Sequence, residues 1–271
     1  MKFFAIRDEE AQETKDLAYL IYYEREKRFY IELPDEADFW ETPLILSSFA
    51  KRGIKTVNAY WSKIWVQQRI VPPDRQNLGQ ILKDNGLKEY DEFELLMLAD
   101  GRCAQDSYYL TEVSEKVLLN AFELRYQKRV EDVVPLTDCQ LLVFFRDGMI
   151  HKCDVKALVG NDRQFAPVIK NREIFCTVEV QTGGYGVCWG ENLNIPDSVL
   201  YESSQAIPLT DMDLRQYIYH RVIDTTEATG LLNCSRQNIE DLVRRGKLHP
   251  VKITHKIKLF LKSEIRQRLW K

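Results

Sequence analysis

The first part of the chain carries apolar positions in two patterns, short continuous runs and a helical spacing of three or four. The run Lys27–Leu33 predicts a strand, which Pro34 ends. Helical spacing predicts three helices, at 44–51, 74–83 and 90–98, with Asp74 capping the second. The stretch Val57–Ile70 has an ambiguous period. These patterns predict an N-terminal α+β domain at residues 1–127.

Residues 128–208 are dominated by strand runs joined by tight turns. Gln140–Phe145 and Met149–Cys153 flank an Asp-Gly turn, which is a strong signal for a β-hairpin. A second hairpin is expected from strands at 174–181 and 185–189, around the pair Gly183-Gly184. The pattern predicts a small α+β domain with two hairpins.

This middle segment resembles a known family. The resemblance is carried by Val134-Pro135-Leu136, Leu142-Val143-Phe144-Phe145-Arg146-Asp147-Gly148, Cys153-Asp154, Phe165, Phe175, Gly184, Cys188-Trp189 and Asp197-Ser198-Val199-Leu200-Tyr201. These residues look like the small bacterial domain-of-unknown-function family numbered 2442, over about seventy residues. The resemblance implies a compact α+β domain and implies no activity.

Residues 215–271 begin with a pattern typical of two short helices. Asp224 and Glu227 fit a capping box at the start of the first helix. Ser235 can cap a second helix, 236–245, which Gly246 ends. The inward positions share helical spacing and are Ala228, Leu231 and Leu232 in the first helix and Ile239, Leu242 and Val243 in the second. The two helices therefore pack on one apolar side.

Two alternating runs follow these helices. Pro250–Ile253 and Ile257–Leu261 predict a β-hairpin with the basic tip Thr254-His255-Lys256. Ser263 is expected to cap a last helix, 264–270. The order of helix, helix and basic hairpin predicts a small domain separate from the preceding strands.

Charge is distributed unevenly along the chain. The net charge of −3 hides a basic end, because Arg221 and the residues after it include 12 Lys/Arg and 5 Asp/Glu. The remainder holds 26 Lys/Arg and 36 Asp/Glu. A basic domain on an acidic body suggests binding to a polyanion. Charge alone fits a solvated basic face equally well.

The basic end resembles the winged helix-turn-helix of the excisionase and MerR type. The resemblance is carried by Thr226-Glu227-Ala228, Leu231-Leu232-Asn233-Cys234-Ser235-Arg236-Gln237-Asn238-Ile239, Arg245-Gly246-Lys247-Leu248 and Phe260-Leu261-Lys262-Ser263-Glu264-Ile265. It implies DNA binding by Arg236, Gln237 and the lysines of the hairpin. The sequence departs from the family's pattern in carrying the acidic residues Glu240 and Asp241 on the second helix.

The residues we expect to contact double-stranded DNA lie at the helix starts, the end of the second helix and the hairpin. Polar residues in the first turn of a second helix are those that a helix-turn-helix offers to base edges, and a basic hairpin can meet phosphates. The full set is Thr226, Ser235, Arg236, Gln237, Asn238, Arg244, Arg245, Lys247, Lys252, His255, Lys256 and Lys258.

Motifs of other chemistry are missing from the sequence. The six cysteines and four histidines are scattered, without the spacing of a zinc site, and we expect reduced thiols and no metal. We find no phosphate-binding loop and no nucleophile motif, and we expect no cofactor and no catalytic residues. No apolar run approaches the roughly 20 residues of a membrane span, and the start lacks a signal peptide. We therefore expect a cytoplasmic protein without a membrane partner.

Three functions remain open. The first is a DNA-binding transcriptional regulator. The second is an antitoxin-like protein or mobile-element adaptor that binds a protein partner, or a second copy, through the acidic body at 1–208. The third is an enzyme with a site among Trp61, Trp65, Arg69, Asp74 and Arg75, although such residues more often form buried salt bridges. The antitoxin-like protein would also bind its own operator through the basic end. The DNA-binding regulator is favoured, because the winged helix-turn-helix pattern and the excess of Lys/Arg in the basic end point to it directly.

Overall fold

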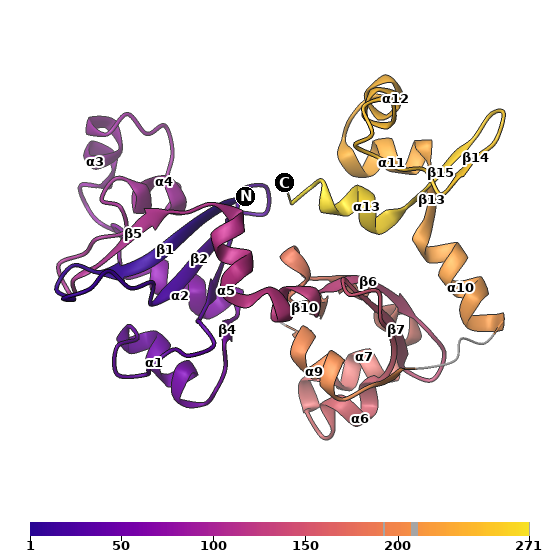
Figure 1. Cartoon of the computed structure of the whole chain (residues 1–271), viewed down its shortest axis with the longest axis horizontal. Helices are drawn as coiled ribbons and strands as arrows, with labels where there is room; N and C mark the ends of the chain where they lie inside the picture. The colour runs from indigo at the N-terminus through magenta and orange to yellow at the C-terminus, as the bar shows by residue number, and fades with distance from the viewer. Residues whose placement is uncertain (192, 207–210, 271) are drawn as a thin grey trace. The chain divides into compact units, whose positions relative to one another are not determined.

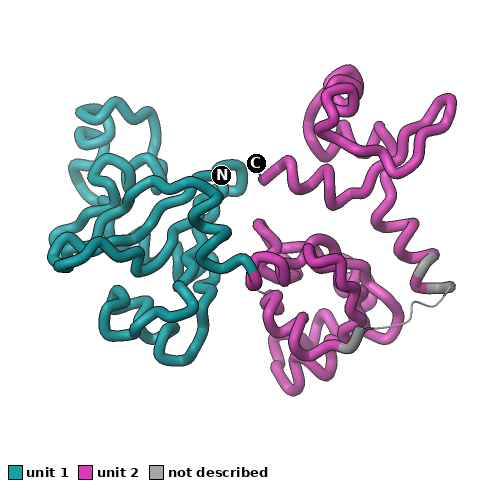
Figure 2. The backbone as a smooth tube through the Cα atoms, in the orientation of Figure 1, with its two compact units in different colours: residues 1–123 teal, residues 124–271 magenta. Residues whose placement is uncertain are grey.

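The computed structural model describes residues 1–191, 193–206 and 211–270. It contains 38% helix and 24% strand in several small sheets, which confirms the predicted α+β class. The chain divides into two compact units, Met1–Glu123 and Leu124–Lys271 (Figure 2). Each unit is described separately.

The first unit is built on an antiparallel five-stranded sheet in the order β4-β3-β2-β1-β5 (Figure 1). Its strands are β1 (Lys2–Asp8), β2 (Ala18–Tyr23), β3 (Arg28–Glu32), β4 (Thr56–Val57) and β5 (Tyr108–Glu112). The strand predicted at 27–33 is confirmed as β3. Strand β2 is buried along its whole length. It therefore lacks the alternation of apolar and polar residues that marks a half-buried strand in a sequence.

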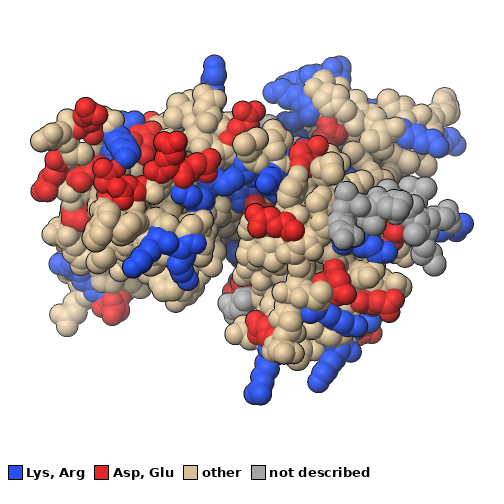
Figure 3. Space-filling model, turned by 60° about the horizontal axis from the view of Figure 1, so that its bottom comes forward, with Lys and Arg blue, Asp and Glu red and all other residues tan. Residues whose placement is uncertain are grey.

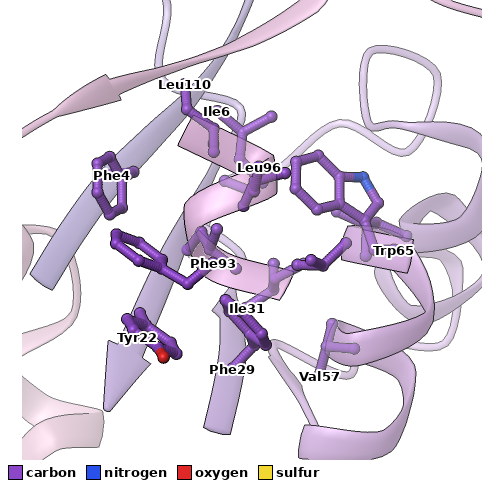
Figure 4. Close-up of a cluster of buried hydrophobic side chains, with 14 of the residues drawn as sticks. Phe4, Ile6, Tyr22, Phe29, Ile31, Val57, Trp65, Phe93, Leu96 and Leu110 are labelled. Carbon is purple, nitrogen blue, oxygen red and sulfur yellow. The ribbon is translucent and has the colours of Figure 1, made fainter. Parts of the chain in front are cut away.

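Helices pack against this sheet and enclose an aromatic core. They are α1 (Leu44–Lys51), α2 (Ala59–Gln67), α3 (Leu78–Asp84), α4 (Glu92–Met97) and α5 (Glu115–Gln127), of which α5 is kinked at Phe122 and runs past the end of the first unit. Trp65 of α2 and Phe93 of α4 point into the core, where Phe93 stacks on Tyr22 with ring centroids 4.2 Å apart (Figure 4). Burial of these large side chains is the main stabilising contribution to the unit.

The structure settles the ambiguous stretch 57–70 and corrects the predicted helix start at Asp74. The ambiguous stretch 57–70 contains α2, because the Asn58 side chain accepts a 3.0 Å hydrogen bond from the Trp61 amide and so starts a helix. The prediction that Asp74 caps a helix is wrong. Residues before Leu78 form hydrogen-bonded turns instead, with the Arg75 amide donating to the Pro72 carbonyl.

Two of the residues considered for an enzyme site, Arg69 and Trp65, lie at a half-buried ion pair. Arg69 donates to both carboxylate oxygens of Asp106, at 2.9 and 2.6 Å, and to the Gly101 carbonyl at 3.1 Å. Its guanidinium lies 4.0 Å from the centre of the Trp65 ring. These contacts connect α2 and the residues that follow it to the segment before β5.

The second unit begins with two small sheets. A four-stranded sheet has the order β12-β8-β7-β6, and a three-stranded sheet has the order β11-β10-β9. The strands are β6 (Val130–Pro135), β7 (Gln140–Phe145), β8 (Ile150–Asp154), β9 (Glu179–Val180), β10 (Gly186–Trp189), β11 (Leu193–Pro196) and β12 (Gln205–Ala206). The helices are α6 (Val155–Val159), α7 (Ala166–Lys170), α8 (Arg172–Phe175) and α9 (Asp197–Glu202), with 3₁₀ turns η1 (Arg163–Phe165) and η2 (Thr182–Gly184).

The first predicted hairpin is confirmed as β7 and β8, whereas the second differs in its first strand. Asn171 accepts hydrogen bonds from two backbone amides and starts α8, so residues 172–175 are helical rather than extended. Only Glu179 and Val180 pair with β10. Phe175 lies in α8 and its side chain is buried in the core. The apolar residue that suggested a strand is therefore buried from a helix instead.

The last part of the second unit contains helices and a third small sheet. Its elements are α10 (Asp211–Arg221), β13 (Val222–Asp224), α11 (Thr225–Leu232), α12 (Arg236–Arg244), β14 (Lys252–Ile253), β15 (Lys258–Leu261) and α13 (Lys262–Gln267). The sheet has the order β13-β15-β14. We call residues 222–270 the C-terminal module. Its core is separate and consists of Ile223, Ala228, Ile239, Leu248, Phe260 and Ile265.

The end of this module corrects one prediction. Ser263 does not cap the last helix, because β15 runs directly into α13 and the cap position falls on Leu261. Ser263 lies buried in the first turn, and the helix ends at Gln267 rather than at Trp270.

Candidate functional site

The helices α11 and α12 are fixed at their starts by side-chain caps. Asp224 accepts a 2.9 Å hydrogen bond from the Glu227 amide, and Glu227 accepts one of 3.2 Å from the Asp224 amide. This is the capping box that the sequence predicted. Ser235 accepts from the Asn238 amide at 3.2 Å and so starts α12, as predicted. Between the helices Asn233 adopts a left-handed conformation, with φ of 49°, which turns the chain sharply.

Packing decides which side of α12 faces outward. Ile239 is fully buried among the core residues of the module, and Leu242 and Val243 are partly buried against the same core. The opposite side carries Arg236, Gln237 and Glu240, which are exposed. A strongly one-sided helix of this kind presents its polar side to solvent or to a partner.

Four polar residues are exposed together where α12 begins. Ser235, Arg236, Gln237 and Asn238 follow one another along the chain and are all accessible. Arg236 also donates a 2.9 Å hydrogen bond to the hydroxyl of Thr226 in α11. The contact orients the Arg236 side chain and leaves its other guanidinium donors available for a partner.

The hairpin of β14 and β15 lies on the same module and carries basic side chains. Its tip is closed by the Thr254 amide, which donates to the Ile257 carbonyl at 2.8 Å. Lys252, His255 and Lys256 are exposed on it. On its other edge β15 pairs with β13, so that Asp224 lies opposite Leu259. The residue that caps α11 is therefore also part of the sheet, which ties the hairpin to the helix pair.

The two acidic residues of α12 are paired with cations. Glu240 forms an ion pair with Lys258 of β15. Asp241 forms ion pairs with Arg244 and, at 2.7 Å, with Arg245. Lys247, Lys252 and Lys256 form no ion pair with any residue that the structure describes. The cations expected to contact DNA thus form two groups. Arg244, Arg245 and Lys258 are paired with carboxylates, whereas Lys247, Lys252 and Lys256 are not.

Acidic and basic side chains are unevenly distributed over the surface. One face shows Asp and Glu gathered over the first unit, and Lys and Arg projecting from the C-terminal module (Figure 3). The first unit holds 23 Asp/Glu and 16 Lys/Arg, in keeping with this view. Six basic residues of the module are exposed, where a polyanion could meet them, and they are Arg236, Arg244, Arg245, Lys247, Lys252 and Lys256.

A polar junction attaches the C-terminal module to β6, and no pattern in the sequence predicted it. Arg266 of α13 lies 3.5 Å from Asp132, and Gln267 donates to Glu131 at 3.2 Å. Arg221, at the end of α10, lies 3.4 Å from Glu131 and 3.8 Å from Asp132. Its guanidinium also lies 4.1 Å from the centre of the Phe144 ring.

Burial sets the protonation behaviour of this junction. Burial raises the pKa of Asp132, and the positive charges of Arg266 and Arg221 oppose that rise. Burial also lowers the pKa of Lys262, and the charge of Arg266 lowers it further. The charged groups of the junction are partly buried and interact with one another. Removal of one charge therefore changes the electrostatic energy of the others.

The described residues hold no candidate metal centre. None of them form a group of three or more side chains suited to a metal ion. The six cysteines are free thiols, and Cys153, which is buried, has a pKa raised by that burial to about 11. The helices that the structure describes include none with the length and apolar character of a membrane span.

Comparison with known proteins identifies one segment. Residues 130–206 match the family model described as a protein of unknown function (DUF2442), which confirms the resemblance of the middle segment. The match covers less than a third of the chain. Comparisons with curated proteins and with solved structures gave no match.

Proposed function

We propose that the protein binds double-stranded DNA through its C-terminal module and acts as a transcriptional regulator. In this proposal α11 and α12 are a helix-turn-helix, and the hairpin of β14 and β15 is a basic wing. The observation that carries the proposal is the exposed polar turn from Ser235 to Asn238, on a helix whose opposite side is locked into a core. The start of the second helix is the part that enters the major groove in helix-turn-helix proteins.

The proposed contacts divide into base readers and phosphate binders. Arg236 and Gln237 have the side chains that pair with guanine and with adenine through two hydrogen bonds each. Lys252, His255 and Lys256 on the wing, together with Lys247, would meet phosphates, which position a protein without reading sequence. The contact between Arg236 and Thr226 supports this division, because it restricts the guanidinium before DNA arrives.

One module of this size makes few base contacts. Single DNA-binding modules bury a small area, and useful specificity usually requires a second module or a partner. The regulator in this proposal therefore acts as a homodimer or together with another protein. The acidic part of the chain, residues 1–208, is available for that association.

The test is selection of bound sequences from a random pool of duplexes, followed by anisotropy measurements with the full chain. Substitution of Arg236 and Gln237 by Ala is expected to flatten sequence preference, with a loss of roughly 1–3 kcal/mol at each contacted base pair. Lys256→Ala should weaken binding to every duplex alike. Lys156→Ala removes an exposed cation of α6 and serves as the control. Wild-type protein that binds no duplex would refute the function, and unchanged binding by the variants would refute the residue assignment.

A second candidate function is favoured by a different surface. Trp40 is 82% exposed and Leu44 is 88% exposed, on a segment that also carries Asp38 and Glu41. The segment is ordered by hydrogen bonds, since the Asp38 side chain accepts from the Trp40 amide at 2.9 Å. Ordered exposed tryptophan is typical of protein interfaces. This supports an antitoxin-like or adaptor role with a basic protein partner.

Substitution of Trp40 distinguishes the two proposed functions. If the segment binds a protein, Trp40→Ser should abolish co-purification of a partner from the native host without changing DNA binding. Tyr60→Ser, at an exposed aromatic of α2, provides a matched control. Recovery of the same proteins with wild-type and W40S chains would contradict the second function.

A further inference from the structure

Two carboxylates of α12 lie on the same sides of the helix as Arg236 and Gln237, the proposed base readers. Glu240 follows Arg236 by four residues, and Asp241 follows Gln237 by four, so each lies one turn further along the same side. Phosphates of DNA repel carboxylates. A helix that docks on DNA through these sides therefore carries two groups that oppose docking.

The other acidic residues of the basic end serve the fold. Of the five Asp/Glu from Arg221 onward, Asp224 and Glu227 form the capping box of α11. Glu264 accepts hydrogen bonds from the backbone and the ring of His249, at 2.8 and 2.9 Å. Among the described residues, the carboxylates of Glu240 and Asp241 accept no hydrogen bond from a backbone amide and cap no helix, and their partners are the cations Lys258, Arg244 and Arg245.

We propose that Glu240 and Asp241 are counter-charges that hold Lys258, Arg244 and Arg245 back from DNA phosphates and so weaken binding to DNA of arbitrary sequence. The inference rests on the proposed DNA-binding function and adds a rule for its specificity. Affinity for arbitrary DNA depends mainly on how many phosphates a protein neutralises, whereas base contacts carry the sequence information. Lowering the phosphate contribution therefore raises the ratio of specific to non-specific binding.

The position of Lys258 makes it the most informative of the three cations. It is the first residue of β15, next to the tip of the proposed wing and opposite Ile253, and its side chain is 23% exposed. Glu240 is 53% exposed and approaches Lys258 from α12. Because the pair joins the helix to the wing, loss of the carboxylate frees a cation at the place where both elements would meet DNA.

The experiment measures how binding of the full chain to a labelled duplex of random sequence depends on salt. Glu240→Gln is expected to steepen the slope of log K against log salt by about 0.9, the value for one additional phosphate contact. At about 0.1 M salt this corresponds to roughly eightfold tighter binding to random DNA. The double variant E240Q with Lys258→Gln should return to the wild-type slope, because the cation that was released is then absent.

A matched control separates local from general charge effects. Glu202→Gln changes the net charge by the same amount at an exposed position of α9, and should leave the slope unchanged. An equal gain in E202Q, or no gain in E240Q when the wild type binds, would overturn the inference. Circular dichroism should show an intact fold in each variant, because exposed ion pairs contribute little to stability.

Two further outcomes are distinct from these. Loss of binding to a selected sequence with unchanged binding to random DNA would overturn the inference and make Glu240 a base reader, since a carboxylate can accept from the amino group of cytosine. If neither the wild type nor E240Q binds any duplex, the proposed function itself is refuted. The failure of the inference and the failure of the function therefore give different results.

Discussion

Arg266 in the last helix lies 3.5 Å from Asp132 in β6, although the two residues are 134 positions apart in the chain. The carboxylate of Asp132 is 3% exposed and would be costly to bury alone. Its pairing with Arg266 and Arg221 therefore fastens the C-terminal module to the strand that begins the DUF2442-like segment.

Removal of Arg266 should loosen this junction. Arg266→Ala leaves Asp132 with Arg221 as its remaining close cation, and we expect a cost of roughly 1–3 kcal/mol, below the full cost of breaking a buried pair because Arg266 is partly exposed. Hydrogen exchange should accelerate in both α13 and β6. Arg268→Ala is the control, since Arg268 donates to the Lys247 carbonyl within the module. Equal exchange of β6 in R266A and wild type would argue against the junction.

Acidification should destabilise the second unit. Burial lowers the pKa of His151, which packs against Phe145 and contacts the Ser204 hydroxyl, and burial likewise lowers the pKa of His220. A histidine with a depressed folded-state pKa contributes stability that is present above its unfolded pKa of about 6.5 and is lost as pH falls toward the folded value. Melting temperature of the unit should therefore fall below about pH 6.5.

Substitution of the buried histidine tests this pH dependence. His151→Asn keeps a polar side chain and cannot take up the proton, so the fall in melting temperature should be smaller than in the wild type. His255→Asn, at the exposed tip of the hairpin, should leave the profile as it is. A wild-type profile retained in H151N would show that His151 does not cause the effect.

The cap of α12 separates folding from DNA binding. Ser235→Ala should destabilise the helix by about 1 kcal/mol, because the Asn238 amide loses its acceptor. Ser235→Asp should retain the cap, since aspartate is an equally good one. It should nevertheless weaken DNA binding, because it adds a negative charge where phosphates would approach. Thermal unfolding and anisotropy together check the pair of variants, and tight DNA binding by S235D would contradict the proposed orientation of α12.

Two glycines with similar backbone angles should respond very differently to alanine. Gly184 has φ of +82°, and a Cβ there would lie 2.4 Å from the Val130 carbonyl oxygen, a backbone atom that cannot move aside. Gly148 has φ of +84° with no atom within 4 Å of that position. Gly148→Ala should cost about 1 kcal/mol for the backbone conformation alone. Gly184→Ala should cost clearly more, which denaturant unfolding of the second unit can show.

Local sequence determined much of the C-terminal module. Ser235 and the capping box of Asp224 and Glu227 start helices through contacts that span only three residues, and such contacts can be recognised without knowledge of the fold. The apolar spacing of Ile239, Leu242 and Val243 likewise predicts which side of α12 is buried. The matched family segment was recognisable for a related reason, since its hairpin turn is set by adjacent residues, Asp147 and Gly148.

Contacts between distant residues were decided only by the tertiary structure. β13 is three residues long and becomes a strand because β15 supplies its hydrogen-bond partners, 35 or more residues later in the chain. The pairing of Glu240 with Lys258 and of Asp132 with Arg266 depends in the same way on folding. Side chains that are far apart in sequence have no mutual pattern to detect, because their energies arise only when packing brings them within a few ångströms.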